Sequence, residues 1–82
     1  MPSVSDFKYK EVIKILVTFG FEQIHKDKSG SHRIYFDKEE DKTVSVPYHG
    51  KKKIAPGTMS NIIRCSGRTR NEWFTELKKL RS

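Results

Sequence analysis

Cysteine, proline and glycine are scarce in this 82-residue sequence, which contains one, three and five of them. The lone cysteine, Cys65, excludes an internal disulfide and a cysteine-rich zinc cluster, which often stabilise domains of this size. No apolar run approaches the roughly 18–20 residues that span a bilayer, and the N-terminus lacks the basic-then-apolar order of a signal peptide. We therefore expect a cytoplasmic protein without a membrane segment, stabilised by side-chain packing.

Metal-binding patterns are missing as well. The three histidines never occur as a His-x-x-x-His pair, and the acidic residues at positions 37, 39, 40 and 41 are grouped in one short connector typical of a solvent-facing turn. The chain is also short enough for only one domain. We expect a single domain over residues 1–82, with residues 1–6 as a flexible N-terminal extension, and neither a metal nor a small-molecule cofactor.

Positive charge is the most informative property of the composition. The formal net charge is +7, and the surplus lies entirely after residue 42: residues 1–42 carry eight basic and eight acidic side chains, and residues 43–82 carry nine and two. Such an asymmetry favours a polyanionic partner such as a nucleic acid, because each neutralised phosphate releases counterions. A basic surface that serves only solubility is the alternative.

The first segment with helical periodicity covers residues 8–19. Apolar residues recur there at steps of three and four, and Gly20 follows at a position suited to a left-handed C-terminal residue. The segment predicts an amphipathic helix. Its apolar face is expected to contain Tyr9, Val12, Ile13, Leu16, Val17 and Phe19.

Two more helices are predicted near the C-terminus. One begins at Pro56, which suits a first helical turn, and ends at Gly67. The other follows Thr69, which forms a capping box with Glu72. The expected buried positions are Met59, Ile62 and Ile63 in the first of these helices and Trp73, Phe74, Leu77 and Leu80 in the second.

Three stretches of β-forming residues separate the first helix from the second: 21–26, 31–37 and 43–47. In the second stretch Ile34 and Phe36 share one face, and in the third Val44 and Val46 do. Each strand is therefore expected to present an apolar face to the core. The connectors are short and polar, so the sheet should be antiparallel, and its segregation from the helices indicates an α+β fold.

The first of these strands is irregular. Phe21 and Ile24 have opposite parity, so both can reach one core only through a bulge or a strong twist.

His32 is the residue best suited to catalysis. It follows Gly30 and Ser31 where a flexible turn enters the second strand, and an imidazole that titrates near neutral pH can take a proton from a ribose 2′-hydroxyl or return one to a leaving 5′-oxygen. The structural alternative is a histidine at the edge of the core, because His32 shares its parity with Ile34 and Phe36. The pattern alone favours that alternative.

The densest basic region comes just before the second helix. Lys51, Lys52 and Lys53 precede Pro56, at a helix start whose free amides favour phosphate, and Arg64 lies on the polar side of the same helix. These residues could line one phosphate track. A lysine run is equally typical of a solvated loop.

Four motifs occur in a fixed order along the chain: Gly-Ser-His at 30–32, Val-Ser-Val-Pro at 44–47, His-Gly at 49–50 and Ile-Ala-Pro-Gly-Thr-Met at 54–59. Together with the amphipathic helix before them and Ile-Ile-Arg at 62–64, they resemble the HicA family of type II toxins, also called YcfA-like. The resemblance covers nearly the whole of residues 8–80.

The resemblance implies a double-stranded-RNA-binding-domain-like fold of order α-β-β-β-α, here with a short additional C-terminal helix. It also implies a ribonuclease that cleaves mRNA and arrests growth, and a HicB-like antitoxin protein as partner. The family's catalytic histidine corresponds to His32, and the glycine of its turn to Gly30. Many relatives have a second histidine where this chain has Arg33, which argues against a two-histidine mechanism in that turn.

These inferences predict a metal-independent endoribonuclease. His32 would be catalytic, and the RNA would contact Gly30, Ser31, Arg33, Lys51, Lys52, Lys53 and Arg64. The second proton-transfer group stays open between His49, Tyr35, a lysine and water. Two other functions are compatible with the sequence: a non-catalytic RNA-binding module of the same fold, and a protein-interaction domain whose basic face meets an acidic partner.

Overall fold

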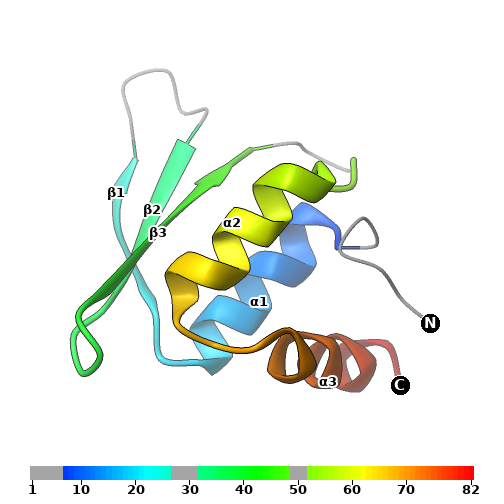
Figure 1. Cartoon of the computed structure of the whole chain (residues 1–82). Coiled ribbons are helices and arrows are strands. Elements are labelled where there is room, and N and C mark those ends of the chain that lie inside the picture. The colour runs from blue at the N-terminus through cyan, green and yellow to red at the C-terminus, as the bar shows by residue number, and fades with distance from the viewer. Residues whose placement is uncertain (1–6, 27–31, 49–51) are drawn as a thin grey trace.

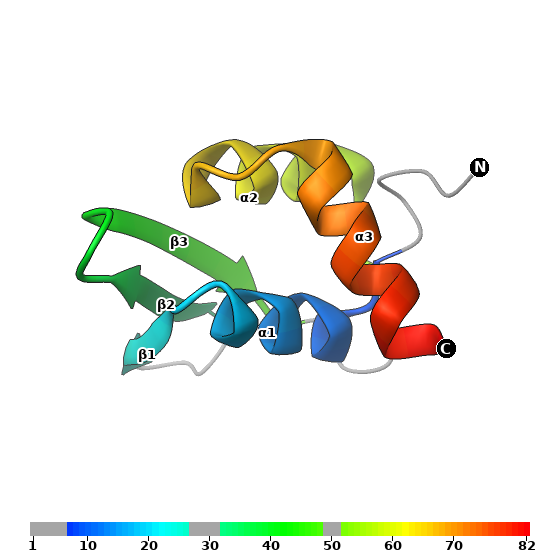
Figure 2. The ribbon, with the colours of Figure 1, turned by 90° about the horizontal axis from the view of Figure 1, so that it is seen from below.

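The computed structural model describes residues 7–26, 32–48 and 52–82 (Figure 1). The elements follow the order α1 (Tyr9–Thr18), β1 (Glu22–Lys26), β2 (His32–Asp37), β3 (Lys42–Pro47), α2 (Pro56–Ser66) and α3 (Arg70–Arg81). The strands form one antiparallel sheet in the order β1-β2-β3, and the helices lie on the same side of it (Figures 1 and 2). The predicted α+β fold, α-β-β-β-α with a further C-terminal helix, is confirmed. The expected N-terminal extension, residues 1–6, falls outside the described residues.

The local signals for helix ends act as predicted. Gly20 follows the C-cap residue of α1, Phe19, and has a φ of 101°, and Gly67 ends α2 with a φ of 74°. Pro56 is the first residue of α2. Before α3, Thr69 Oγ1 accepts a hydrogen bond from the Glu72 N–H at 3.2 Å, and the Glu72 carboxylate accepts one from the Thr69 N–H at 3.0 Å.

One core lies between the helices and the sheet. Trp73, Met59 and Leu77 are fully or almost fully buried, which confirms that Trp73 serves packing. Leu80, expected to be buried beside them, is 41% exposed. The predicted stripe of α1 is wrong at one position: Val17 is 57% exposed, and Ile15 is buried instead. The buried apolar residues are Phe7, Tyr9, Val12, Ile15, Leu16, Phe21, Tyr35, Val44, Val46, Ile54, Met59, Ile62, Ile63, Trp73 and Leu77.

The predicted inner face of β2 is also wrong. Tyr35 is buried, whereas Ile34 and Phe36 are only half-buried on the other side of the strand. The register explains this, because Tyr35 pairs with Val44 and both face the helices. Val44 and Val46 place one side of β3 in the core. The β2 residues that pair with them, Tyr35 and Arg33, therefore lie on the same side of the sheet.

Two further predictions for the sheet need correction. The register of β1 and β2 shifts between Gln23 and His25, so a bulge is present as expected, but it leaves Ile24 55% exposed. Asp37, expected to face solvent, is buried. Its carboxylate accepts a hydrogen bond from the Glu39 N–H at 3.1 Å and thereby stabilises the turn between β2 and β3.

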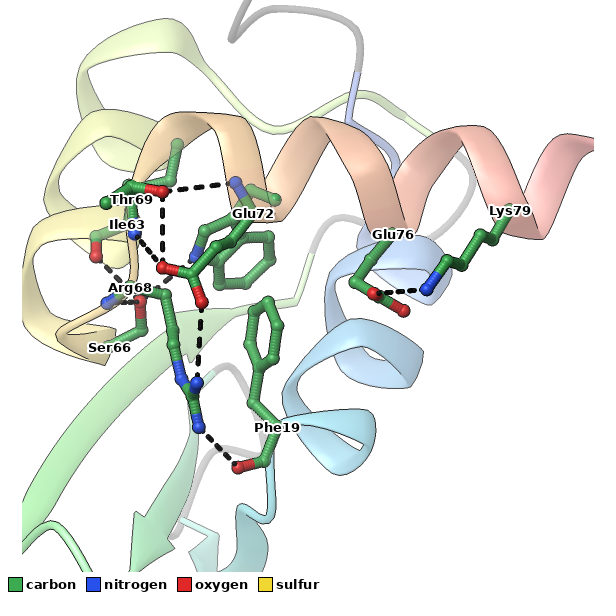
Figure 3. A network of polar contacts seen from close by, with 9 residues as sticks. Phe19, Ile63, Ser66, Arg68, Thr69, Glu72, Glu76 and Lys79 are labelled. Atoms are coloured by element: carbon green, nitrogen blue, oxygen red, sulfur yellow. Dashed lines mark hydrogen bonds and ion pairs between the residues drawn. The ribbon is translucent and has the colours of Figure 1, made fainter.

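Polar contacts connect the end of α2 with α3 (Figure 3). Arg68 lies between the two helices: its guanidinium donates to the Glu72 carboxylate and to the Phe19 carbonyl, each at 3.4 Å. It also stacks on the Phe19 ring, with Cζ 4.9 Å from the ring centroid. These contacts hold the α2–α3 junction against the end of α1.

Candidate active site

His32 is the first residue of β2 and is exposed. It pairs with Pro47, the last residue of β3, and has the same parity as Ile34, on the side of the sheet away from the helices. The edge-of-core alternative for His32 is therefore wrong. We call the end of the sheet where His32 pairs with Pro47 the His32 end.

Arg33 lies at the same end but on the helix side. Its guanidinium carbon is 5.9 Å from the centroid of the Tyr9 ring and 5.7 Å from that of Tyr48. The two rings meet edge to face, with centroids 5.0 Å apart and an interplanar angle of 78°. Burial raises the pKa of Tyr9, and the positive charge of Arg33 opposes this rise without cancelling it. Tyr9 is therefore a neutral phenol at physiological pH, and Arg33 is a permanent cation.

Backbone contacts place the loop before α2 beside the start of α1, at the His32 end. Lys53 forms an isolated antiparallel bridge with Lys8, and the Ile54 N–H donates to the Phe7 carbonyl at 2.8 Å. Lys8 is the N-cap of α1, so the starts of α1 and α2 lie at the same end, as Figure 1 shows. Lys8, Lys52 and Lys53 are all exposed there. Lys8 was not predictable as part of this site, because no local sequence signal connects it with residue 53.

Arg64 lies elsewhere. It belongs to the last turn of α2, about 12 Å along the helix axis from Pro56, and donates a hydrogen bond to Asn61 Oδ1 at 2.7 Å. The structure thus brings Lys52 and Lys53 together with Arg33 at one end of the sheet, but not with Arg64. Gly30, Ser31, His49 and Lys51 lie outside the described residues.

The opposite end of the sheet carries a small excess of acidic side chains. The turn between β2 and β3, at the far end of β2 from His32, exposes Glu39, Glu40 and Asp41 between the exposed Lys38 and Lys42 (Figure 1). The described charges therefore divide along the strands, with a cationic His32 end and an acidic turn. The positive ends of the α1 and α2 dipoles add to the cationic side.

Tyr35 is poorly placed as the second proton-transfer group. It lies on the helix side of β2, whereas His32 lies on the other side. Burial raises the pKa of Tyr35, and the neighbouring Tyr9 raises it further. A buried phenol on the wrong side of the sheet cannot exchange a proton with a substrate bound at His32.

The described part of the chain has neither a metal-binding cluster nor a membrane-spanning helix. Residues 7–26, 32–48 and 52–82 contain no group of three His, Cys, Asp or Glu side chains arranged to hold a metal ion. None of the helices described is both long and apolar enough to cross a membrane.

Comparison with known families identifies the chain. The family model described as the HicA toxin of bacterial toxin-antitoxin systems matches residues 9–67, from the start of α1 to the glycine that ends α2. No curated protein matches the chain. The matched range includes β2 with His32, β3 and the loop with Lys52 and Lys53, and it covers more than two thirds of the 82 residues. The chain belongs to the HicA toxin family.

Proposed function

We propose that this HicA-family toxin is an endoribonuclease that cleaves mRNA and thereby inhibits translation and growth. The observation that carries the proposal is the position of His32: an exposed imidazole on the open face of the sheet, at its cationic end. His32 would act on the 2′-hydroxyl as general base, or on the leaving 5′-oxygen as general acid. Lys52 and Lys53 would hold the adjacent phosphates, and Arg33 would contact the RNA from the helix side of the same end.

The reaction we propose is internal attack. The 2′-oxygen attacks the neighbouring phosphorus as its proton leaves, and the bond from phosphorus to the 5′-oxygen breaks as that oxygen gains a proton. The products are a 2′,3′-cyclic phosphate and a 5′-hydroxyl. DNA lacks the 2′-hydroxyl and would stay intact. No step requires a metal, because the nucleophile belongs to the substrate and the lysines supply charge stabilisation.

We also propose a HicB-like antitoxin as the partner that neutralises the toxin. An acidic or apolar segment of such a protein could cover His32, since the histidine is exposed beside cationic residues and the half-buried Ile34. The toxin-antitoxin family of the chain supports this partner.

The experiment incubates the purified protein with a labelled mRNA and a DNA of the same sequence, in EDTA. The proposal predicts cleavage of the RNA alone and products with cyclic phosphate ends. His32→Ala should abolish most of the cleavage, and His25→Ala, which removes a histidine from the adjacent strand, serves as the matched control. Circular dichroism establishes that each variant is folded.

Two outcomes would contradict the proposal. Cleavage of both nucleic acids at equal rates would exclude attack by the 2′-hydroxyl. Salt-dependent RNA binding by wild type and His32→Ala, with cleavage by neither, would establish the non-catalytic RNA-binding module instead.

A further inference from the structure

Three side chains from separate segments meet on the helix side of the His32 end: Tyr9, Arg33 and Tyr48. We call them the Tyr-Arg cluster. Tyr9 opens α1, Arg33 belongs to β2, and Tyr48 follows the last residue of β3. Arg33 is within 6 Å of both ring centroids, a distance at which a guanidinium is attracted to the face of an aromatic ring.

Packing alone does not account for this cluster. Tyr48 keeps 53% of its surface exposed, although its ring is held by Tyr9 and by Arg33. An exposed ring with two fixed contacts is positioned in advance, so a ligand that stacks on it need not first order the side chain.

Two polar atoms of the cluster are buried without a partner. Tyr9 is 6% exposed, and its Oη has no hydrogen-bond partner among the described residues; the same is true of Arg33 Nε. Buried polar atoms are nearly always hydrogen-bonded in folded proteins, so the cluster is expected to take up a polar partner, either an ordered water or a polar group of a ligand.

The cluster is next to the proposed catalytic residue. His32 and Arg33 are consecutive in β2, so they project to opposite sides of the strand, and Pro47 opposite His32 directly precedes Tyr48. A strand of RNA that passes His32 on the open face and continues around the end of the sheet would reach Tyr48. Lys8 and Lys53 lie at the same end.

We propose that the Tyr-Arg cluster binds an unpaired nucleobase of the RNA, one that neighbours the nucleotide cut at His32, with the Tyr48 ring as the stacking surface. Exposed aromatic rings combined with cationic side chains are the usual means of binding single-stranded nucleic acid, because every base has a face that can stack. Arg33 cannot exchange protons at neutral pH, so at this position it serves binding. The inference rests on the proposed function.

The experiment measures binding of a single-stranded oligoribonucleotide in the His32→Ala background, where cleavage does not interfere. Tyr48→Leu removes the aromatic ring but keeps an apolar side chain, and Tyr48→Trp keeps a ring. We expect Tyr48→Leu to raise the Kd by about 5- to 150-fold, the range of one base stack, and Tyr48→Trp to bind as well as the parent. Leu80→Ala, at an exposed apolar residue of α3, is the control and should leave the Kd unchanged.

A series of oligonucleotides, each with one abasic site, makes the test specific. At one position the missing base should weaken binding to the parent protein by the same factor as Tyr48→Leu, and should cause no further loss in Tyr48→Leu itself. This non-additivity is not expected if Tyr48 serves only the fold.

Unchanged RNA affinity in Tyr48→Leu would overturn the inference, even if His32-dependent cleavage persists. If Tyr48→Leu binds RNA normally but no longer binds a HicB-like protein, the cluster is a protein-docking site and not a base-binding site. Conversely, Tyr48-dependent binding without any cleavage by the wild type would overturn the proposed ribonuclease and leave the base-binding site standing.

Discussion

Trp73 Nε1 donates a hydrogen bond to Ser66 Oγ at 3.0 Å, inside the core. The hydroxyl of Ser66 in turn donates to the Ile63 carbonyl at 2.6 Å and accepts from the Arg68 N–H at 3.2 Å (Figure 3). Ser66 is the last residue of α2, and Trp73 is part of α3, beyond the range that matches the HicA family. Through this contact α3 is part of the core.

Ser66→Ala should therefore destabilise the fold. It leaves the buried indole N–H of Trp73 without its acceptor, and the free energy of unfolding should fall by about 1–3 kcal/mol. Urea denaturation measures the change. Ser82→Ala, at the exposed end of α3, is the matched control and should change it little. Equal stability of Ser66→Ala and wild type would show that the hydrogen bond adds nothing to the fold.

The two ends of the described chain are joined by an ion pair with a predictable pH dependence. Arg81 Nε donates to Glu11 Oε2 at 2.8 Å, and Nη2 donates to Oε1 at 3.0 Å. These bonds from Arg81 hold the pKa of Glu11 below its ordinary value. A lowered pKa in the folded state adds stability above the ordinary pKa of the carboxyl, and this stability is lost as the pH falls through the folded-state pKa.

Glu11→Gln should thus lower the free energy of unfolding by about 1 kcal/mol at pH 7 and have a smaller effect at acidic pH. Thermal unfolding of both proteins from pH 7 down to pH 3 measures the difference. A difference that stays constant over this range would contradict the assigned ion pair.

Gly67 is needed for its backbone conformation. Its φ of 74° is unfavourable for a residue with a Cβ. Space is not the obstacle, because a Cβ at this position would meet only the flexible side chain of Lys42, at 3.1 Å. Gly67→Ala should cost about 1 kcal/mol. Gly57→Ala is the control, because no atom lies within 4 Å of its added Cβ and alanine is the better helix former. Equal stability of the two variants would show that the positive φ of Gly67 does not disfavour alanine.

Lys52 and Lys53 should contribute to RNA binding through charge. The double substitution Lys52→Ala and Lys53→Ala should weaken binding and make it less salt-dependent, with the slope of log K against log salt smaller by about 1.4. Lys78→Ala with Lys79→Ala removes the same charge from α3 and should leave the slope near that of wild type. Fluorescence anisotropy at four salt concentrations measures the slopes. Identical slopes for the two double variants would show that Lys52 and Lys53 do not contact the RNA phosphates.

The order of the elements was predictable from the sequence because its signals are local. Apolar spacing defines α1, while Pro56, Gly67 and the Thr69 cap mark the ends of α2 and α3. The inner face of β2 was not predictable, since Tyr35 and Ile34 are both compatible with burial and only the pairing with β3 decides between them.

The candidate site was predictable only in part. The Gly-Ser-His turn drew attention to His32, but its exposure on the open face depends on which side of the sheet the helices cover. The Tyr-Arg cluster has no sequence signature at all. Tyr9, Arg33 and Tyr48 lie far apart in the chain and meet only through the arrangement of α1, β2 and the end of β3.

The most direct test of the account is the rate of single-turnover RNA cleavage by His32→Ala, compared with wild type at saturating protein and in EDTA. The proposed mechanism predicts a rate about 10²–10⁴-fold lower, with the Kd for RNA nearly unchanged, because it assigns proton transfer and not RNA binding to His32. Cleavage by His32→Ala at the wild-type rate would contradict the central role of this histidine.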